Sequence, residues 1–85
     1  MDKYLVDIYY LGTLKHYDFW ISKHMNIRSS LDKIIEEIRL FENNPKLFLD
    51  EEKVMIYSKR SGLPLGYDMT LFQSGIRSGD TLYII

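Results

Sequence analysis

The two histidines are the side chains of this sequence best suited to acid–base chemistry or metal binding near neutral pH. His16 falls between two segments of alternating hydrophobicity, and His24 lies in a polar stretch before a helical pattern. Neither has a carboxylate or a second histidine at the spacing of metal ligands. The chain has no cysteine, so a thiolate nucleophile and a cysteine-bound metal are excluded. We interpret both histidines as solvated loop residues and expect no catalytic residue and no metal site.

The acidic run and the glycines match no ligand-binding motif either. Asp50, Glu51 and Glu52 are consecutive, so their carboxylates point in different directions and lack the glycine and alternating oxygens of a calcium loop. The five glycines do not form a phosphate-binding pattern, and Gly62 and Gly66 flank an apolar Leu-Pro-Leu. We therefore expect an exposed turn at the acidic run, no cofactor and no enzymatic activity.

Length and charge restrict the class of protein further. Eighty-five residues with 46% hydrophobic positions predict a single domain over residues 1–85, with one core and no room for a large active site. Eleven Lys plus Arg against twelve Asp plus Glu give a net charge of -1, which argues against nucleic-acid binding. No segment approaches the ~20 apolar residues of a membrane span, and no signal peptide is visible. We expect a cytoplasmic protein without direct membrane insertion.

Hydrophobic periodicity predicts five strands and one helix. Period-two alternation predicts strands over residues 1–10, 17–22, 53–59, 63–65 and 81–85. The fourth of these is a short edge strand, because Pro64 has no N–H to donate to a central ladder.

The helix is predicted between the second and third strands. Ser29 and Asp32 have the spacing of a capping box that would start it, and Asn43, Asn44 and Pro45 would end it. Its buried stripe comprises Leu31, Ile34, Ile35, Ile38 and Phe41. The resulting order is ββαβββ, an α+β roll with a mixed sheet packed on one helix.

This order matches the β-grasp fold, and the residues of the last third fall at the spacings of ubiquitin: Leu65, Thr70, Leu71, Ile76, Thr81 and Leu82. The chain resembles most closely the YukD and EsaB family of ubiquitin-like proteins. The match rests on Tyr17-Asp18-Phe19 and on a C-terminal pattern of Leu71, Gly75, Ile76, Gly79, Asp80 and Leu82. The resemblance implies a cytoplasmic accessory protein of a Gram-positive type VII secretion system. Such a protein would associate with the membrane components or the secretion ATPase and would not be exported.

The sheet face turned away from the helix is the candidate site. In the strand order of a β-grasp sheet, the outward positions are unusually apolar, and we predict a partner-binding face with these anchors: Trp20, Tyr9, Tyr83, Met55 and Tyr57. Rim charges such as Asp7 would set the docking register. The same face could pair with itself in a symmetric homodimer. The alternative is that these side chains are exposed without any function, as surface aromatic residues often are.

Two other functions remain open at this point. Ubiquitin and the sulfur carriers act through a flexible tail that ends in Gly-Gly, whereas this sequence ends in Tyr83, Ile84 and Ile85 within a predicted strand. We therefore do not expect conjugation, and a modifier or sulfur carrier would need a Gly-Gly tail beyond this chain. A β-grasp regulatory domain that binds RNA or a small molecule is the second alternative.

Overall fold

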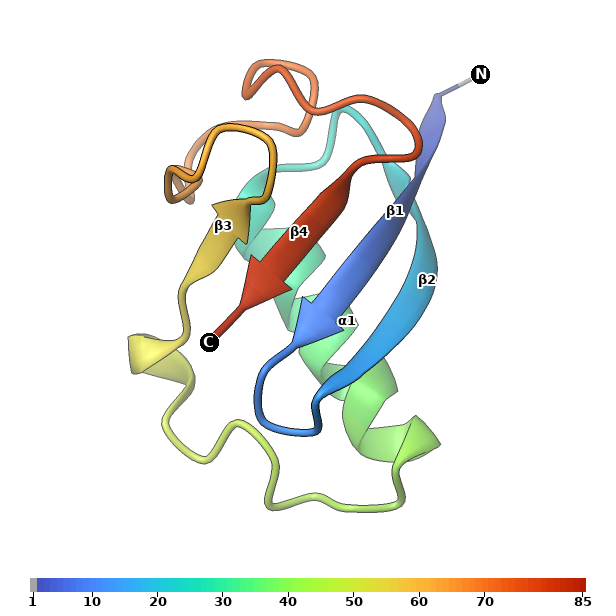
Figure 1. Cartoon of the computed structure of the whole chain (residues 1–85), viewed down its shortest axis with the longest axis vertical. Coiled ribbons are helices and arrows are strands. Elements are labelled where there is room, and N and C mark those ends of the chain that lie inside the picture. The colour runs from blue at the N-terminus through green and yellow to red at the C-terminus, as the bar shows by residue number, and fades with distance from the viewer. Residues whose placement is uncertain (1) are drawn as a thin grey trace.

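The structure is a computed structural model that describes residues 2–85, and it contains a four-stranded mixed sheet with one helix across one face (Figure 1). The elements are β1 (Lys3–Tyr10), β2 (Lys15–Ser22), α1 (Ile27–Phe41), the short 3-10 helix η1 (Glu51–Lys53), β3 (Ile56–Ser58) and β4 (Thr81–Ile84). The strand order is β2-β1-β4-β3, with β1 and β4 parallel and the other two pairs antiparallel. This confirms the predicted α+β architecture.

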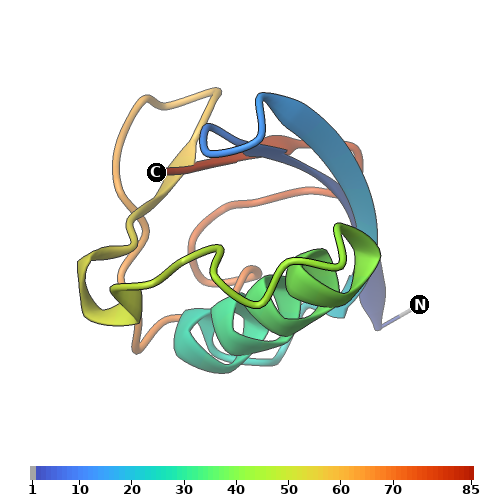
Figure 2. The same ribbon diagram turned by 90° about the horizontal axis from the view of Figure 1, so that it is seen from below.

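The core lies between the sheet and α1, as Figure 2 shows from below. Alternate residues of each strand point toward the helix and are buried, as the period-two pattern predicts: Val6, Ile8, Tyr10, Tyr17, Phe19, Ile21, Ile56, Leu82 and Ile84. The helix contributes Leu31, Ile34, Ile35 and Ile38 from its predicted stripe, whereas Phe41 is exposed and lies against the ring of Tyr17. The predicted inward faces of the strands are therefore confirmed.

The start of α1 differs from the prediction. Its N-cap is Asn26, whose side-chain Oδ1 accepts a hydrogen bond of 2.8 Å from the backbone N–H of Ser29. The helix therefore starts before the Ser29–Asp32 pair, and Ser29 lies inside its first turn. The predicted end is correct, because Asn43 adopts a left-handed conformation (φ 51°) directly after the C-cap Glu42.

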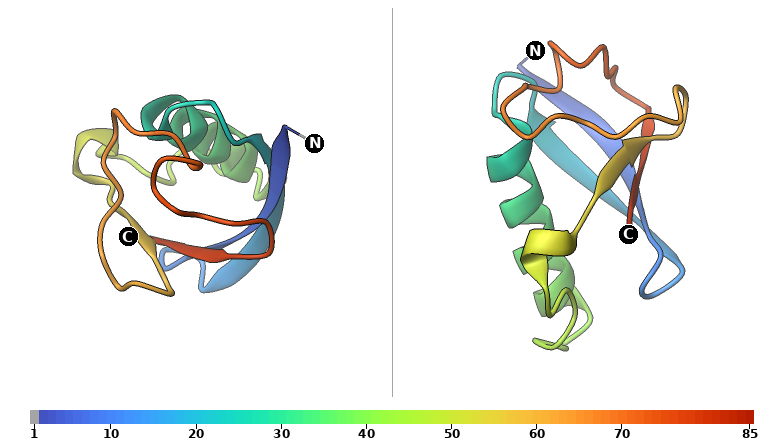
Figure 3. Two further views of the ribbon diagram at one scale, coloured as in Figure 1. Left: turned by 90° about the horizontal axis from the view of Figure 1, so that it is seen from above. Right: turned by 90° about the vertical axis from the view of Figure 1, so that its left-hand side faces the viewer.

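The predicted third and fourth strands are shorter in the structure. β3 covers only Ile56–Ser58, and residues 63–65 form no strand but one isolated bridge, between Pro64 and Tyr57. Two backbone hydrogen bonds flank this bridge, from Ser58 N to Leu63 O and from Leu65 N to Ile56 O. Since Pro64 has no N–H, the segment cannot extend the ladder. It lies within residues 59–80, which form the irregular connection at one end of the molecule in Figure 3.

The connection between α1 and β3 is packed against the core before it reaches the predicted exposed turn. The ring of Phe48 stacks on Tyr10 with centroids 4.0 Å apart. Arg39 on α1 donates hydrogen bonds to the carbonyls of Leu47 and Phe48 and pairs with Glu51 at 2.7 Å. The acidic run is exposed and forms the start of η1.

Candidate functional site on the outer face of the sheet

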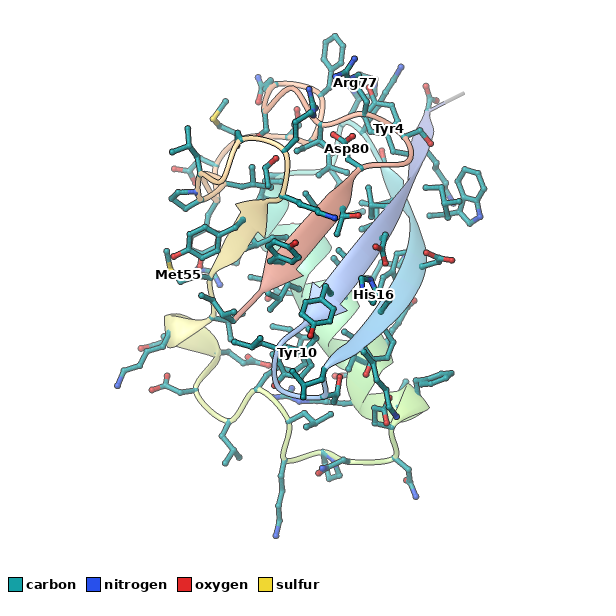
Figure 4. The ribbon with its side chains drawn as sticks, viewed as in Figure 1. Tyr4, Tyr10, His16, Met55, Arg77 and Asp80 are labelled. Atoms are coloured by element: carbon teal, nitrogen blue, oxygen red, sulfur yellow. The ribbon has the colours of Figure 1, made fainter. Side chains whose placement is uncertain are left out.

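Aromatic side chains cross the outer face of the sheet in one row. Tyr9 on β1 is opposite His16 on β2 and Tyr83 on β4, and Tyr83 is opposite Tyr57 on β3. We call these four residues the aromatic row. Figure 4 looks onto this face, with His16 toward β2 and Met55 toward β3.

Ring contacts join three members of the aromatic row, Tyr9, His16 and Tyr83. The centroids of Tyr9 and His16 are 4.6 Å apart, and those of Tyr9 and Tyr83 are 5.7 Å apart in an edge-to-face arrangement with an interplanar angle of 75°. The three tyrosines of the row are half-buried. Because the rings of Tyr9 and Tyr83 already contact each other, a partner that binds them loses little side-chain entropy.

A shallow hollow of about 400 Å³ lies beside the aromatic row, over the half of the sheet that carries β4 and β3. Its lining comprises Tyr9, Leu11, Tyr57, Ser58, Gly62, Tyr83 and Ile85. Leu11 and Ile85 are each about half exposed, at 51% and 50%. Aromatic and aliphatic walls of this kind suit an apolar side chain of a partner.

A polar row crosses the same face next to the aromatic row. Asp7 on β1 is opposite Asp18 on β2 and Thr81 on β4, and the backbone N–H of Lys59 donates to the carbonyl of Thr81. Lys59 directly follows β3 and is exposed, and the alternation from Tyr57 assigns it to the outer face. We call Asp18, Asp7, Thr81 and Lys59 the polar row. Asp7 accepts one hydrogen bond from Thr81 Oγ1 (3.0 Å), and its carboxylate lies 2.9 Å from His16 Nδ1. The row is thus acidic on its β1–β2 side and basic at its β3 end.

The five predicted anchors all lie on the outer face, but they do not form one patch. Tyr9, Tyr57 and Tyr83 line the hollow, and Met55 lies beside it, paired with Ile85 through two backbone hydrogen bonds of 2.8 and 3.0 Å. Trp20 is 50% exposed and lies opposite Leu5 on β1. The polar row separates Trp20 from the hollow, because Asp18 lies between Trp20 and His16 along β2.

Two residues of the face were missed by the sequence analysis. His16 was predicted to be a solvated loop residue, but β2 starts at Lys15 and places His16 in the strand, against Tyr9 and Asp7. Leu11 lies just beyond β1 and is held there by a hydrogen bond of 3.0 Å from its N–H to Ile84 O. The alternation of each strand continues through these positions and is the signal that could have identified them.

Outside this face, one charged cluster ties β2 to the end of α1. Lys15 Nζ lies 2.9 Å from Glu42 Oε1, and the Tyr17 hydroxyl donates to Glu42 Oε2 at 2.8 Å. The hydrogen bond with Glu42 raises the pKa of Lys15, and the same bond lowers the pKa of Glu42. Burial is the main cause that raises the pKa of Tyr17. The cluster is structural, since its polar groups satisfy one another.

Another ion pair, between Arg60 and Asp80, fixes the loop before β4. Arg60 donates from one Nη to the carbonyl of Gly75 and to Asp80 Oδ2, each at 2.7 Å. Partial burial alone would raise the pKa of Asp80, but the backbone N–H of Arg77 and the guanidinium of Arg60 outweigh it and lower that pKa. The segment that leads into Thr81 is thereby held in place.

Residues 2–85 contain no group of three or more His, Cys, Asp and Glu side chains placed to hold a metal ion. Within the same residues, the helical segments are too short or too polar for any of them to cross a lipid bilayer.

Several solved structures share this fold, although no protein-family model and no curated protein matches the sequence. The ubiquitin-like domain of EccD5 from Mycobacterium xenopi is 19% identical with a TM-score of 0.78, and the match covers 100% of this chain and 94% of that one. The ubiquitin-like domain of the Mycobacterium tuberculosis type VII secretion system protein EccD1 is 14% identical with a TM-score of 0.72, over 100% and 99% of the two chains.

The same fold also occurs outside secretion systems. A ubiquitin-like protein from Trypanosoma brucei is 12% identical with a TM-score of 0.71, over 99% of this chain and 94% of that one. At these identities the likeness establishes the fold, which is the ubiquitin-like β-grasp predicted from the sequence.

Proposed function

We propose that this chain is a non-catalytic, ubiquitin-like interaction module that docks a protein partner on the outer face of its sheet. The observation that carries the proposal is the hollow beside the aromatic row, where half-buried tyrosines surround a space for an apolar side chain. Buried aromatic anchors with a polar rim are typical of the energetic centre of protein interfaces.

In this mechanism the two rows have different roles. The hollow takes an apolar side chain of the partner, with Tyr9, Tyr57 and Tyr83 as walls, and Met55 extends the contact at the β3 edge. The polar row fixes the orientation, because charges at an interface select register and partner more than they add affinity. Trp20 forms a second, separate anchor on the β2 side.

We further propose that the partner belongs to a type VII secretion system and that this chain is a cytoplasmic accessory or regulatory component of it. It would lie near the membrane through a membrane component or the secretion ATPase. Two points support this assignment: the resemblance of the sequence to the YukD and EsaB family, and the structural likeness to the ubiquitin-like domains of EccD5 and EccD1.

Affinity capture from detergent-solubilised membranes and cytosol tests both parts of the proposal. The tagged protein is compared with a Tyr57→Ala, Tyr83→Ala double variant and with Phe72→Ala, which removes a 58% exposed aromatic ring in the 59–80 connection, outside the hollow and both rows. We expect type VII membrane components to be enriched by the wild type and by Phe72→Ala but not by the double variant. Equal enrichment by all three proteins would refute docking on the outer face. Enrichment of unrelated proteins would refute the type VII assignment.

A further inference from the structure

The outer face is complementary to itself about one particular axis. A two-fold axis that runs along the strands, between β1 and β4, exchanges the two sides of the sheet when a second copy is laid face to face on the first. In the strand order β2-β1-β4-β3, this operation sets β1 against β4 of the second copy and β2 against its β3. The rows stay in register, because the axis is parallel to the strands.

The aromatic row matches itself under this operation. Tyr9 faces Tyr83 of the second copy, and His16 faces its Tyr57, so aromatic rings meet aromatic rings on both sides of the axis. The hollow lies on the β3 side and the Tyr9–His16 ring pair on the β2 side. The ring pair of each copy therefore lies over the hollow of the other.

The neighbouring rows match as well. Asp18, which is exposed and has no ion-pair partner among the described residues, faces Lys59 of the second copy. Asp7 faces Thr81, and on the other side of the aromatic row Leu11 faces Ile85. Apolar positions thus meet apolar ones, and the acidic end of each polar row meets the basic end of the other.

We propose that the outer face binds a second copy of this chain in a symmetric homodimer, with the two sheets face to face and Asp18 paired with Lys59 in each direction. The inference rests on the proposed function in that it uses the same face, and it names the occupant. Two sheets packed in this way keep their strands within about 30° of each other. This angle shifts the edge strands β2 and β3 relative to each other, and the Lys59 side chain is long enough to reach Asp18 across the shift.

The size of the face limits the area that the dimer can bury. Four strands about 4.8 Å apart and three rows about 6.8 Å apart cover roughly 400 Å² of sheet, so each copy buries on the order of 500 Å². This lies at the low end of specific interfaces. The dimer is therefore weak and exchanges rapidly, which leaves the face available to another protein that binds it more tightly.

Sedimentation equilibrium with charge-swap variants tests the proposal. The wild type is measured from about 20 µM to about 1 mM, the range in which a complex of this size dissociates. Its average mass should rise with concentration from 10.1 kDa toward twice that value. Asp18→Lys and Lys59→Glu should each raise the dissociation constant about tenfold, because the symmetry makes each substitution disturb two contacts. The Asp18→Lys, Lys59→Glu double variant should restore it.

Glu36→Lys is the matched control, since it makes the same charge change on the exposed side of α1, and it should leave the dissociation constant unchanged. A wild type that stays at 10.1 kDa up to about 1 mM would overturn the proposal. So would a double variant no better than the single ones, or an effect of Glu36→Lys as large as that of Asp18→Lys.

These outcomes separate the dimer from the proposed function. If the wild type is monomeric and still captures its partner through Tyr57 and Tyr83, the homodimer is excluded and the proposed docking face still holds. A dimer that survives the Tyr57→Ala, Tyr83→Ala double variant would instead place self-association elsewhere and contradict the inference.

Discussion

Tyr9 and Tyr83 lie directly opposite each other on the parallel pair of β1 and β4, with their ring centroids 5.7 Å apart and their planes at 75°. This edge-to-face contact lies at the centre of the outer face and forms one wall of the hollow. Such ring pairs are worth about 0.5–1.5 kcal/mol beyond the area they bury. The centre of the face is therefore ordered before any partner arrives, which makes it suitable for docking.

The opposite orientations of Phe19 and Trp20 give the first prediction. Phe19 points into the core and is 8% exposed, whereas its neighbour Trp20 is 50% exposed on the outer face. We expect Trp20→Ala to change the free energy of unfolding by less than about 1 kcal/mol and Phe19→Ala to lower it by about 3–5 kcal/mol. Urea denaturation of both variants measures this difference, and the reverse order would mean that the two faces of the sheet are exchanged.

The Tyr17 hydroxyl gives the second prediction. It donates to Glu42 at 2.8 Å and lies 2.7 Å from Thr13 Oγ1 on a largely buried side chain. Tyr17→Phe keeps the packing but removes these hydrogen bonds, so the free energy of unfolding should fall by about 1 kcal/mol. Tyr57→Phe is the control, because no hydrogen bond of the Tyr57 hydroxyl is found among the described residues. Equal stability of Tyr17→Phe and the wild type would show that the hydroxyl contributes nothing.

The Asp80 carboxyl gives a prediction of pH dependence. Its pKa in the folded state is lowered, although burial opposes this, by the Arg77 N–H and the Arg60 guanidinium. The ionised carboxylate therefore stabilises the fold at neutral pH, and this contribution is lost as the pH falls below about 4, the usual value in an unfolded chain. Urea denaturation at pH 7 and at about pH 3 should show Asp80→Asn less stable than the wild type at the higher pH and closer to it at the lower. A gap that widens in acid would contradict this assignment.

The turn between β1 and β2 gives the fourth prediction. A Cβ at Gly12 would collide with the ring of Tyr10, which cannot easily move because it is buried and stacked on Phe48 at 4.0 Å. We expect Gly12→Ala to lower the free energy of unfolding by about 1–3 kcal/mol. Gly66→Ala is the matched control, since its Cβ would meet only ordinary contacts with Met69 at 3.6 Å. Similar melting temperatures for the two variants would refute the steric argument.

The fold could be predicted from the sequence because one face of each long strand is buried. Wherever apolar residues alternate, as at Val6 and Ile8, a slip of one residue would expose the whole apolar set, so the pattern fixes the register. The same logic correctly placed Tyr9, Tyr57 and Tyr83 on the outer face. Local signals were less reliable: Ser29 and Asp32 match a capping box, but Asn26 caps the helix.

Which residues lie next to one another on the outer face could not be predicted in the same way. Alternation says which face a residue lies on but not which rows are adjacent, and rows depend on the pairing of β1 with β4 over many intervening residues. The separation of Trp20 from the hollow by Asp7 and Asp18 is visible only once the strands are paired. The same holds for the contact of Asp7 with His16, because the sequence analysis placed His16 in a solvated loop.

Site-specific photo-crosslinking in the cells that produce this protein tests the docking face most directly. A photoreactive phenylalanine analogue is placed at Tyr57, beside the hollow, or at Phe72, which lies outside both rows and the hollow. We expect a covalent adduct with a protein partner from position 57 and none from position 72. An adduct from position 72 alone would contradict the account, because the partner would then bind a different surface.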